Sequence, residues 1–263
     1  MSLIKFFTDD LIFISLYDDC QLFQNSLFSV CFCRKTINQN IFIPIHIKRF
    51  IRQHSNKLSP KYKKEVVLTT EMKDALIGII LGDGHLERLK STSNTRLRVE
   101  QVYPAQEEFL RRVRLIFDPI TNMAPGVLTR KNRRNKGTTQ SLYFWTMTVP
   151  CLNYFHDLFY EDKTKIIPKN VVELLTPIGL AYLIMGDGFL IKEGGVMLCT
   201  DSFTKEHVQL LADALTSRFG LPCTLRKRGD DAYRLYILKS SLPELRAIVG
   251  SFFVPSMLYK LGL

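Results

Sequence analysis

The chain has 263 residues, an apolar fraction of 46% and a formal net charge of +11. This length allows one large globular domain or two ordinary ones, and no apolar run reaches the ~18–20 residues of a membrane-spanning helix. The positive charge favours a polyanionic partner, nucleic acid first and an anionic membrane surface second. Six cysteines are present, but the Cys31–Cys33 pair lacks the second pair of a zinc site, so we expect reduced thiols.

Residues 1–67 are predicted to be an N-terminal extension with a basic linker. Residues 1–45 are rich in Phe, Ile, Asn and Gln, whereas 47–64 is basic and reads as either an arm or a solvated loop. The extension is also consistent with a translated leader fused to the functional part. Acidic residues such as Asp9 and Asp10 argue against a cleaved import presequence, because such presequences are poor in acids. We therefore expect the protein to be made where it acts.

From residue 70 the pattern predicts a half-domain over 68–160, in the order helix, two strands, helix, two strands, helix. Thr70 is the expected N-cap of the first helix, which ends at Gly84. The second helix opens with a proline and carries apolar residues at helical spacing. The expected elements are a helix at 70–84, strands at 85–91 and 95–102, a helix at 104–117, strands at 126–131 and 140–149, and a helix at 150–160.

The same order recurs in a second half-domain over 176–263, after a linker at 161–175. Pro177 begins its first helix, and Gly220 gives its second helix a typical C-terminal stop. Strands are expected at 189–192, 195–201, 222–228 and 232–239, and helices at 203–220 and 241–250. The sequence thus predicts an α+β fold of two pseudo-symmetric αββαββα half-domains.

Two segments of the chain read almost alike, ALIGIILGDGHL at 75–86 and GLAYLIMGDGFL at 179–190. Each is an apolar run that stops at Gly-Asp-Gly, which places Asp83 and Asp187 at equivalent ends of two buried helices. Paired carboxylates stay ionised only with cations between them, so the pattern predicts a divalent metal site. The carbonyls of Gly82 and Gly186 are candidate further ligands. Either motif alone is equally consistent with a core helix that ends in an ordinary Asp-Gly turn.

The predicted strands carry many basic side chains, which alternation brings to one face of each sheet. A β-ribbon fits the DNA major groove, where some Arg and Lys side chains read guanine edges and others hold phosphates. A solvated basic sheet face is the alternative interpretation. The candidate DNA-binding residues are Arg88, Lys90, Arg96, Arg98, Arg130, Lys131, Arg133, Arg134, Lys192, Arg226, Arg228, Arg234 and Lys239.

The motifs LIGIILGDG (76–84) and LAYLIMGDG (180–188) resemble those of the LAGLIDADG homing endonucleases in the monomeric two-motif form. The similarity covers residues 68–263, and segments such as VPSMLYKLGL resemble the omega-intron type. The resemblance implies motif helices at the interface and two sheets that form a saddle on DNA. It also implies cleavage of both strands across the minor groove, which leaves short 3′ overhangs. Gly82, Gly186 and Tyr182 depart from the family pattern without removing a required group.

The resemblance also assigns catalytic roles to individual residues. Asp83 and Asp187 match the acids that bind Mg²⁺ or Mn²⁺, and Ca²⁺ is expected to bind without supporting cleavage. Lys165 and Lys260 match basic residues near the scissile phosphates, where they would stabilise developing charge. Gln101 and Asp201 match polar residues that order water, with Glu100 as the alternative to Gln101. His85, beside Asp83, is interpreted as a DNA or solvent contact rather than a general base.

We therefore expect a monomeric, Mg²⁺-dependent, site-specific double-strand DNA endonuclease. The resemblance suggests that an organellar intron encodes it, mitochondrial rather than chloroplast, and no membrane partner is expected. The alternative is an intron maturase, which would bind its intron RNA with the same basic surface. A transcription regulator built on a decayed nuclease would have lost one of the acids, and both are present.

Overall fold

The computed structural model describes residues 21–25, 28–32, 59–131, 137–229 and 231–263. The chain forms two compact units, 1–55 and 56–263. In the first, β1 (Gln21–Asn25) pairs with β2 (Phe28–Phe32) in an antiparallel ladder. The predicted basic arm at 47–64 lies outside the described residues, except that its end forms α2 (Pro60–Glu65). Across the described ranges, we find no helix with the length and apolarity needed to cross a membrane.

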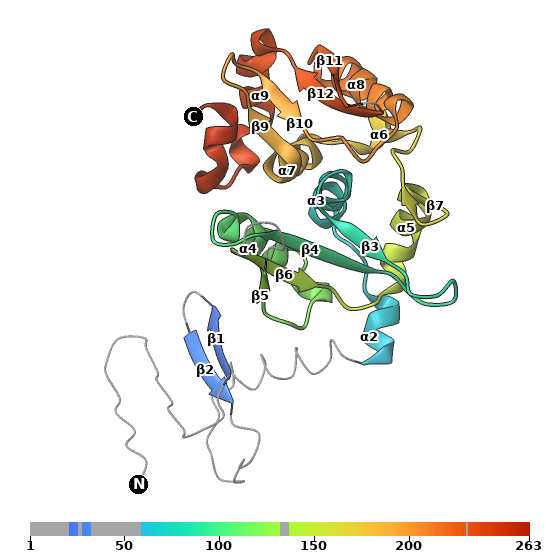
Figure 1. The fold of residues 1–263 in the computed structure, drawn as a ribbon. Coiled ribbons are helices and arrows are strands. Elements are labelled where there is room, and N and C mark those ends of the chain that lie inside the picture. Colours follow the sequence, from blue (N-terminus) through green and yellow to red (C-terminus); the bar gives the residue numbers. More distant parts are fainter. Residues whose placement is uncertain (1–20, 26–27, 33–58, 132–136, 230) are drawn as a thin grey trace, which may run out of the picture. The chain divides into compact units, whose positions relative to one another are not determined.

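The second unit begins with a set of helices and strands that matches the predicted order (Figure 1). Its sheet is antiparallel throughout, with strand order β3-β4-β6-β5. The elements are α3 (Thr70–Leu81), β3 (His85–Glu87), β4 (Arg96–Val102), α4 (Glu107–Ile116), β5 (Gly126–Lys131), β6 (Thr138–Trp145) and α5 (Asn153–Phe159).

A second set repeats this arrangement with the corresponding order β9-β10-β12-β11, again antiparallel. The elements are α6 (Val171–Leu174), α7 (Pro177–Asp187), β9 (Gly188–Leu190), β10 (Val196–Leu198), α8 (Lys205–Phe219), β11 (Cys223–Arg228), β12 (Ala232–Ile237) and α9 (Leu242–Val249). The α+β fold with two repeated sets of helices and antiparallel strands is confirmed.

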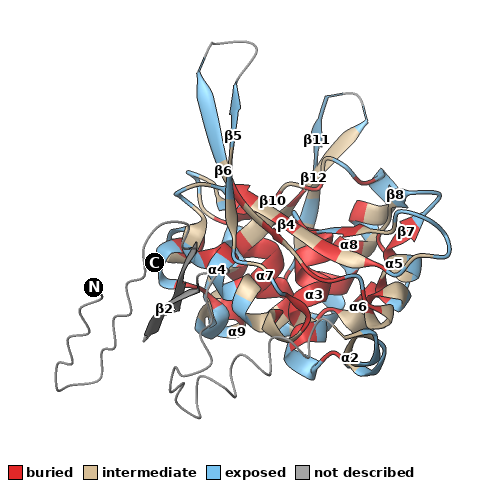
Figure 2. Ribbon diagram, turned by 90° about the horizontal axis from the view of Figure 1, so that it is seen from below, coloured by how far each residue is buried: buried red, intermediate tan, exposed pale blue. Residues whose placement is uncertain are grey.

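The motif helices α3 and α7 lie side by side in the middle of this unit (Figure 1). Both are buried around most of their circumference, as a helix that is apolar on all sides should be. Thr69 rather than Thr70 caps α3, because its hydroxyl accepts a hydrogen bond from the Met72 amide at 3.2 Å. The outer ends of the hairpins β5–β6 and β11–β12 are exposed and extend from one side of the unit (Figure 2).

Several short elements were not predicted. β7 (Tyr160–Glu161) and β8 (Thr164–Lys165) form a small hairpin, so the predicted linker at 161–175 contains β8 and α6. A C-terminal 3₁₀-helix spans Pro255–Leu261. The helix expected at 150–160 begins instead with a 3₁₀ turn, Pro150–Leu152. The division into 1–67, 68–160, 161–175 and 176–263 stays a prediction.

Candidate active site

The two motif helices approach each other through backbone rather than side chains. A Cβ built on Gly78 would lie 1.9 Å from the carbonyl oxygen of Gly179 on α7. Further along, a Cβ on Gly82 would lie 3.6 Å from the Asp187 carboxylate, and one on Gly186 would lie 3.7 Å from that of Asp83. Because each glycine borders the acid of the other motif, the close seam brings the two carboxylates together at one end.

The carboxyl groups of Asp83 and Asp187 lie close enough to interact. Burial and the nearby charge of Asp83 raise the pKa of Asp187, because both disfavour its ionised form. Lys165 and Lys260 oppose this increase. The two halves are not identical here, since Asp187 is the last residue of α7 whereas α3 ends at Leu81, before Asp83. The structure therefore holds two interacting carboxyl groups whose combined charge needs cations.

Each motif helix ends against a lysine, which is half-buried in the case of Lys165 and buried in the case of Lys260. The Lys165 ammonium donates hydrogen bonds to the carbonyls of Ile80 and Gly82, at 2.8 and 2.7 Å. Lys260, which is 4% exposed, donates to the carbonyl of Met185 and, at 3.1 Å, to that of Gly186. These carbonyls are the unpaired acceptors at a helix C-terminus, where the helix dipole favours a cation. The two lysines thus perform the same structural task in the two halves.

Burial lowers the pKa of both lysines, while the two carboxylates favour their charged form. Desolvation is the larger effect for each. Lys165 reaches its site from β8 and Lys260 from the C-terminal 3₁₀-helix. Short connecting segments therefore supply positive charge beside the two acids.

The polar residues predicted to order water behave differently in the two halves. Gln101 is 4% exposed and donates a hydrogen bond from its amide nitrogen to the Asp83 carboxylate at 3.1 Å. Asp201 instead accepts hydrogen bonds from Arg234 at 2.8–3.0 Å and from Arg228 at 3.4 Å. Glu100, the alternative to Gln101, also pairs with arginines. The structure thus brings Gln101 to the acid pair and places Asp201 in an arginine cluster.

Sequence reasoning missed Tyr160, which braces the first motif. Its hydroxyl accepts a hydrogen bond from the Leu86 amide at 3.0 Å and lies 3.1 Å from Nδ1 of His85. Tyr160 and Lys165 are direct partners in the β7–β8 hairpin, so one small hairpin contacts both sides of the first Gly-Asp-Gly turn. The sequence offered no signal for this, because two-residue strands have no detectable periodicity.

The predicted DNA-binding residues fall into three groups. Seven lie on strands of the two sheets: Arg96, Arg98, Arg130, Lys131, Arg226, Arg228 and Arg234. Arg88, Lys90, Lys192 and Lys239 lie outside the strands, and Arg88 pairs with Asp157 at 2.7 Å. Arg133 and Arg134 lie outside the described residues. Alternation therefore accounts for the first group except Lys131, which follows Arg130 directly on β5 and so points to the opposite face of the sheet.

The acid pair fits a hard divalent cation by its donor chemistry. Carboxylate oxygens are the ligands that Mg²⁺ prefers, and close carboxylates otherwise repel each other. The carbonyls of Gly82 and Gly186, predicted as further ligands, already accept hydrogen bonds from Lys165 and Lys260. Within the described ranges, no cluster of three or more His, Cys, Asp or Glu side chains forms a complete protein cage. Two carboxylates with few other ligands suit Mg²⁺, which usually keeps several waters or binds substrate phosphates.

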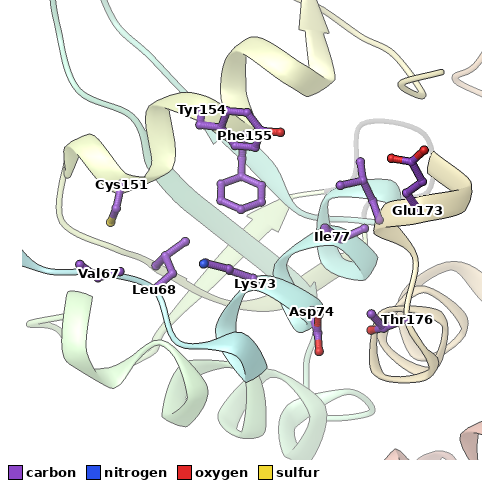
Figure 3. Close-up of a pocket in the computed structure, with 11 residues that line it drawn as sticks. Val67, Leu68, Lys73, Asp74, Ile77, Cys151, Tyr154, Phe155, Glu173 and Thr176 are labelled. Carbon is purple, nitrogen blue, oxygen red and sulfur yellow. The ribbon is translucent and has the colours of Figure 1, made fainter. Parts of the chain in front are cut away.

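A cavity of about 470 Å³ lies near the other end of α3 (Figure 3). Its lining includes Lys73, Asp74 and Ile77 from α3, Phe155 from α5 and Glu173 from α6. Neither Asp83 nor Asp187 borders it. The cavity is therefore separate from the acid pair.

Comparison with known proteins identifies the family. Residues 73–245 match the family described as the LAGLIDADG DNA endonuclease family. The chain belongs to this family. A LAGLIDADG fold explains why two similar motifs end at one acid pair, because each half supplies one motif helix.

Curated relatives of this LAGLIDADG protein carry two kinds of name. The chain is 33% identical to the cytochrome b mRNA maturase bI2 of Debaryomyces hansenii over 199 residues, which cover 74% of this chain and 75% of the relative. It is 28% identical to the DNA endonuclease I-ChuI of Chlamydomonas applanata, with 74% and 96% covered. Both endonucleases and maturases are thus present among similar sequences.

Among solved structures, the chain is similar to the homing endonuclease I-WcaI bound to its DNA recognition sequence. The TM-score is 0.73 at 25% identity, and the match covers 80% of this chain and 97% of I-WcaI. This similarity and the family match confirm the resemblance read from the two motifs. The roles assigned to individual site residues stay predictions.

Proposed function

We propose that the protein is a site-specific homing endonuclease that hydrolyses both strands of a double-stranded DNA target with divalent metal, Mg²⁺ or Mn²⁺. The observation that carries this proposal is the meeting of Asp83 and Asp187 at the end of the glycine seam. Family membership and the similarity to a DNA-bound homing endonuclease support it. Cleavage across the minor groove with short 3′ overhangs, and action as a monomer, are the finer parts of the proposal.

The residues of this chain divide the work as follows. Asp83 and Asp187 would hold the divalent metal, which would supply a polarised phosphate and an activated water. Lys165 and Lys260 hold the helix ends in place and add positive charge beside the reacting phosphates. Gln101 fixes the direction of the Asp83 carboxylate through its hydrogen bond. The basic residues on the strands bind the DNA.

The test is cleavage of DNA that carries the uninterrupted insertion junction of the host intron. The purified chain should cut this DNA with Mg²⁺ and bind it without cutting when Ca²⁺ replaces Mg²⁺. Asp83→Asn removes a charged ligand at nearly constant volume, so cleavage should be lost while binding persists. Cleavage at the wild-type rate by Asp83→Asn would refute the assigned role of this acid.

A maturase function is the second candidate, because two similar proteins are named cytochrome b mRNA maturase bI2. The same basic strands would hold RNA backbone through phosphate contacts. In vitro splicing of the precursor RNA with and without the protein tests this function. Splicing that is stimulated equally by wild type and Asp83→Asn would show that the two activities use different residues.

We also propose that the gene lies in a mitochondrial intron. The support is that related proteins are named as intron-encoded endonucleases or as cytochrome b mRNA maturases. Sequencing the genomic context of the reading frame tests this proposal, and a nuclear locus without an intron would contradict it.

A further inference from the structure

Glu100 on the first sheet holds two arginines at once. Both terminal nitrogens of Arg130 donate to its two carboxylate oxygens, and Arg98 donates to it at 3.0 Å. The hydroxyl of Ser141 also donates to Glu100, at 2.6 Å. These contacts join β4, β5 and β6, and they lower the pKa of Glu100 to about 2, chiefly through the hydrogen bond from Arg130.

Asp201, in the turn that follows β10, accepts hydrogen bonds from two arginines of the second sheet. Nε and Nη2 of Arg234 on β12 donate to it at 2.8–3.0 Å, and Arg228 on β11 donates at 3.4 Å. Arg234 also lies over the ring of Phe189, 5.8 Å from its centroid. Each half therefore contains a carboxylate that binds two arginines from the strands proposed to contact DNA. In the first half Glu87 also accepts from Arg96 at 2.7 Å and from Arg98 at 3.5 Å.

These ion pairs are expected to contribute little to the free energy of unfolding. The side chains of Glu100 and Asp201 are 23% and 34% exposed. Their arginine partners range from 20% exposed for Arg234 to 61% for Arg228. Exposed pairs contribute only about 0–1 kcal/mol. On a face that binds DNA, each carboxylate also repels phosphates. The effect of these acids on DNA recognition is therefore the larger one to consider.

We propose that Glu100 and Asp201 are positioning residues for base recognition, which orient Arg98, Arg130, Arg228 and Arg234 toward base edges and reduce their contacts with phosphates. The inference rests on the proposed DNA-binding function and goes beyond it by separating base-reading from phosphate-holding cations. By contrast, Lys131 and Arg226 contact no carboxylate among the described residues, and Arg226 lies over the ring of Tyr236 at 3.9 Å. They are the expected phosphate contacts.

Two physical reasons support this division. An arginine must give up rotamer freedom to place its planar fork on guanine O6 and N7, and a carboxylate that already holds the side chain reduces this loss on binding. A neighbouring negative charge also weakens the long-range attraction of the arginine to phosphates, which carry no sequence information. Both effects increase the difference between specific and non-specific affinity, which is a difference that repulsive elements help to create.

The experiment measures binding of the full chain to DNA selected from a randomised library, with Ca²⁺ present to prevent cleavage. Glu100→Gln and Asp201→Asn remove one charge each at constant size. Each should bind unselected DNA more tightly and lose roughly five- to a hundred-fold of its discrimination against substitutions at a few base pairs. The slope of log affinity against log salt should steepen by about one for each arginine released to phosphate.

Asp231→Asn is the matched control. Asp231 is exposed in the turn between β11 and β12 and bonds to no arginine within the described residues. Its removal changes net charge equally, so it should raise affinity slightly for every sequence and leave discrimination unchanged. If Asp231→Asn reduces discrimination as much as Asp201→Asn does, general charge rather than positioning explains the result.

A double-mutant cycle tests whether Glu100 affects base discrimination through Arg130. In the Arg130→Ala background, the part of the Glu100→Gln effect that passes through Arg130 should disappear. Parallel losses of specific and non-specific affinity, or unchanged discrimination, would overturn the inference while leaving the proposed nuclease intact. A wild type that enriches no sequence would contradict the proposed function as well.

Discussion

Gly78→Ala adds only one methyl group but should lower the stability of the fold substantially. The new Cβ would lie 1.9 Å from the Gly179 carbonyl oxygen and 2.7 Å from the carbonyl carbon, both backbone atoms that no rotamer change can move. The helices must separate locally by about an ångström or more, and overpacking of this kind costs ~1–3 kcal/mol, occasionally more. Alanine itself favours a helix by roughly 0.5–1 kcal/mol over glycine, which offsets part of the cost. We expect a net loss of about 2 kcal/mol, which is the upper end of this range less the helix-propensity offset.

Urea and thermal unfolding of the purified variant measure this loss. For a unit of this size, about 2 kcal/mol corresponds to a decrease in Tm of roughly 4–8 °C. Cleavage should fall more steeply than stability at permissive temperature, because the displaced seam also separates Asp83 from Asp187. Gly250→Ala is the matched control: Gly250 has φ −58°, and a Cβ there meets nothing within 4 Å. A Gly78→Ala variant with the same urea midpoint and Tm as the wild type would refute the close backbone contact between α3 and α7.

Two further predictions concern Lys260 and the dependence of stability on low pH. Lys260→Met keeps most of the side-chain volume but leaves the Met185 and Gly186 carbonyls without their buried donor, so stability in urea should fall by about 1–3 kcal/mol; an unchanged urea midpoint would show that water or backbone replaces the ammonium. The folded-state pKa of Glu100 lies below its ordinary value of 4.5, at about 2, so its ionised form stabilises the fold. That stability is complete above about pH 4.5 and is lost as pH falls toward 2; after allowance for exposure it amounts to about 1 kcal/mol. Acid titration of stability should lose this component in Glu100→Gln, and identical acid limbs would contradict the ion-pair geometry.

The long elements could be predicted from the sequence because each has a physical signal of its own. The motif helices combine an apolar circumference with a stop at Gly-Asp-Gly, and the strand β4 alternates buried Leu97 and Val99 with Arg96 and Arg98. The meeting of Asp83 and Asp187 was expected from these signals, because two buried helices with the same motif at the same end can pack side by side. Gly179 as the partner of Gly78 did not follow, because the rotation and offset of two packed helices depend on every side chain around them.

The lysines show where reasoning from single segments stops. Lys165 and Lys260 lie in a two-residue strand and a 3₁₀-helix, whose conformations depend on tertiary contacts rather than on periodicity. Only the family resemblance marked them as candidates. The pairing of Glu100 and Asp201 with arginines depends on cross-strand side-chain geometry, which residue types alone do not determine.

The position of Lys165 has a consequence for the construction of hybrid enzymes. Lys165 donates to the carbonyls of Ile80 and Gly82, whereas α6 packs on α8, where Arg218 donates to the Val172 carbonyl. The chain therefore passes from contacts with the first half to contacts with the second half between residues 166 and 170. A chimera that joins the N-terminal half of this chain to the C-terminal half of another protein keeps the Lys165 ammonium only if the junction lies after residue 165. A junction at residue 160 would replace Lys165 with the corresponding residue of the other protein.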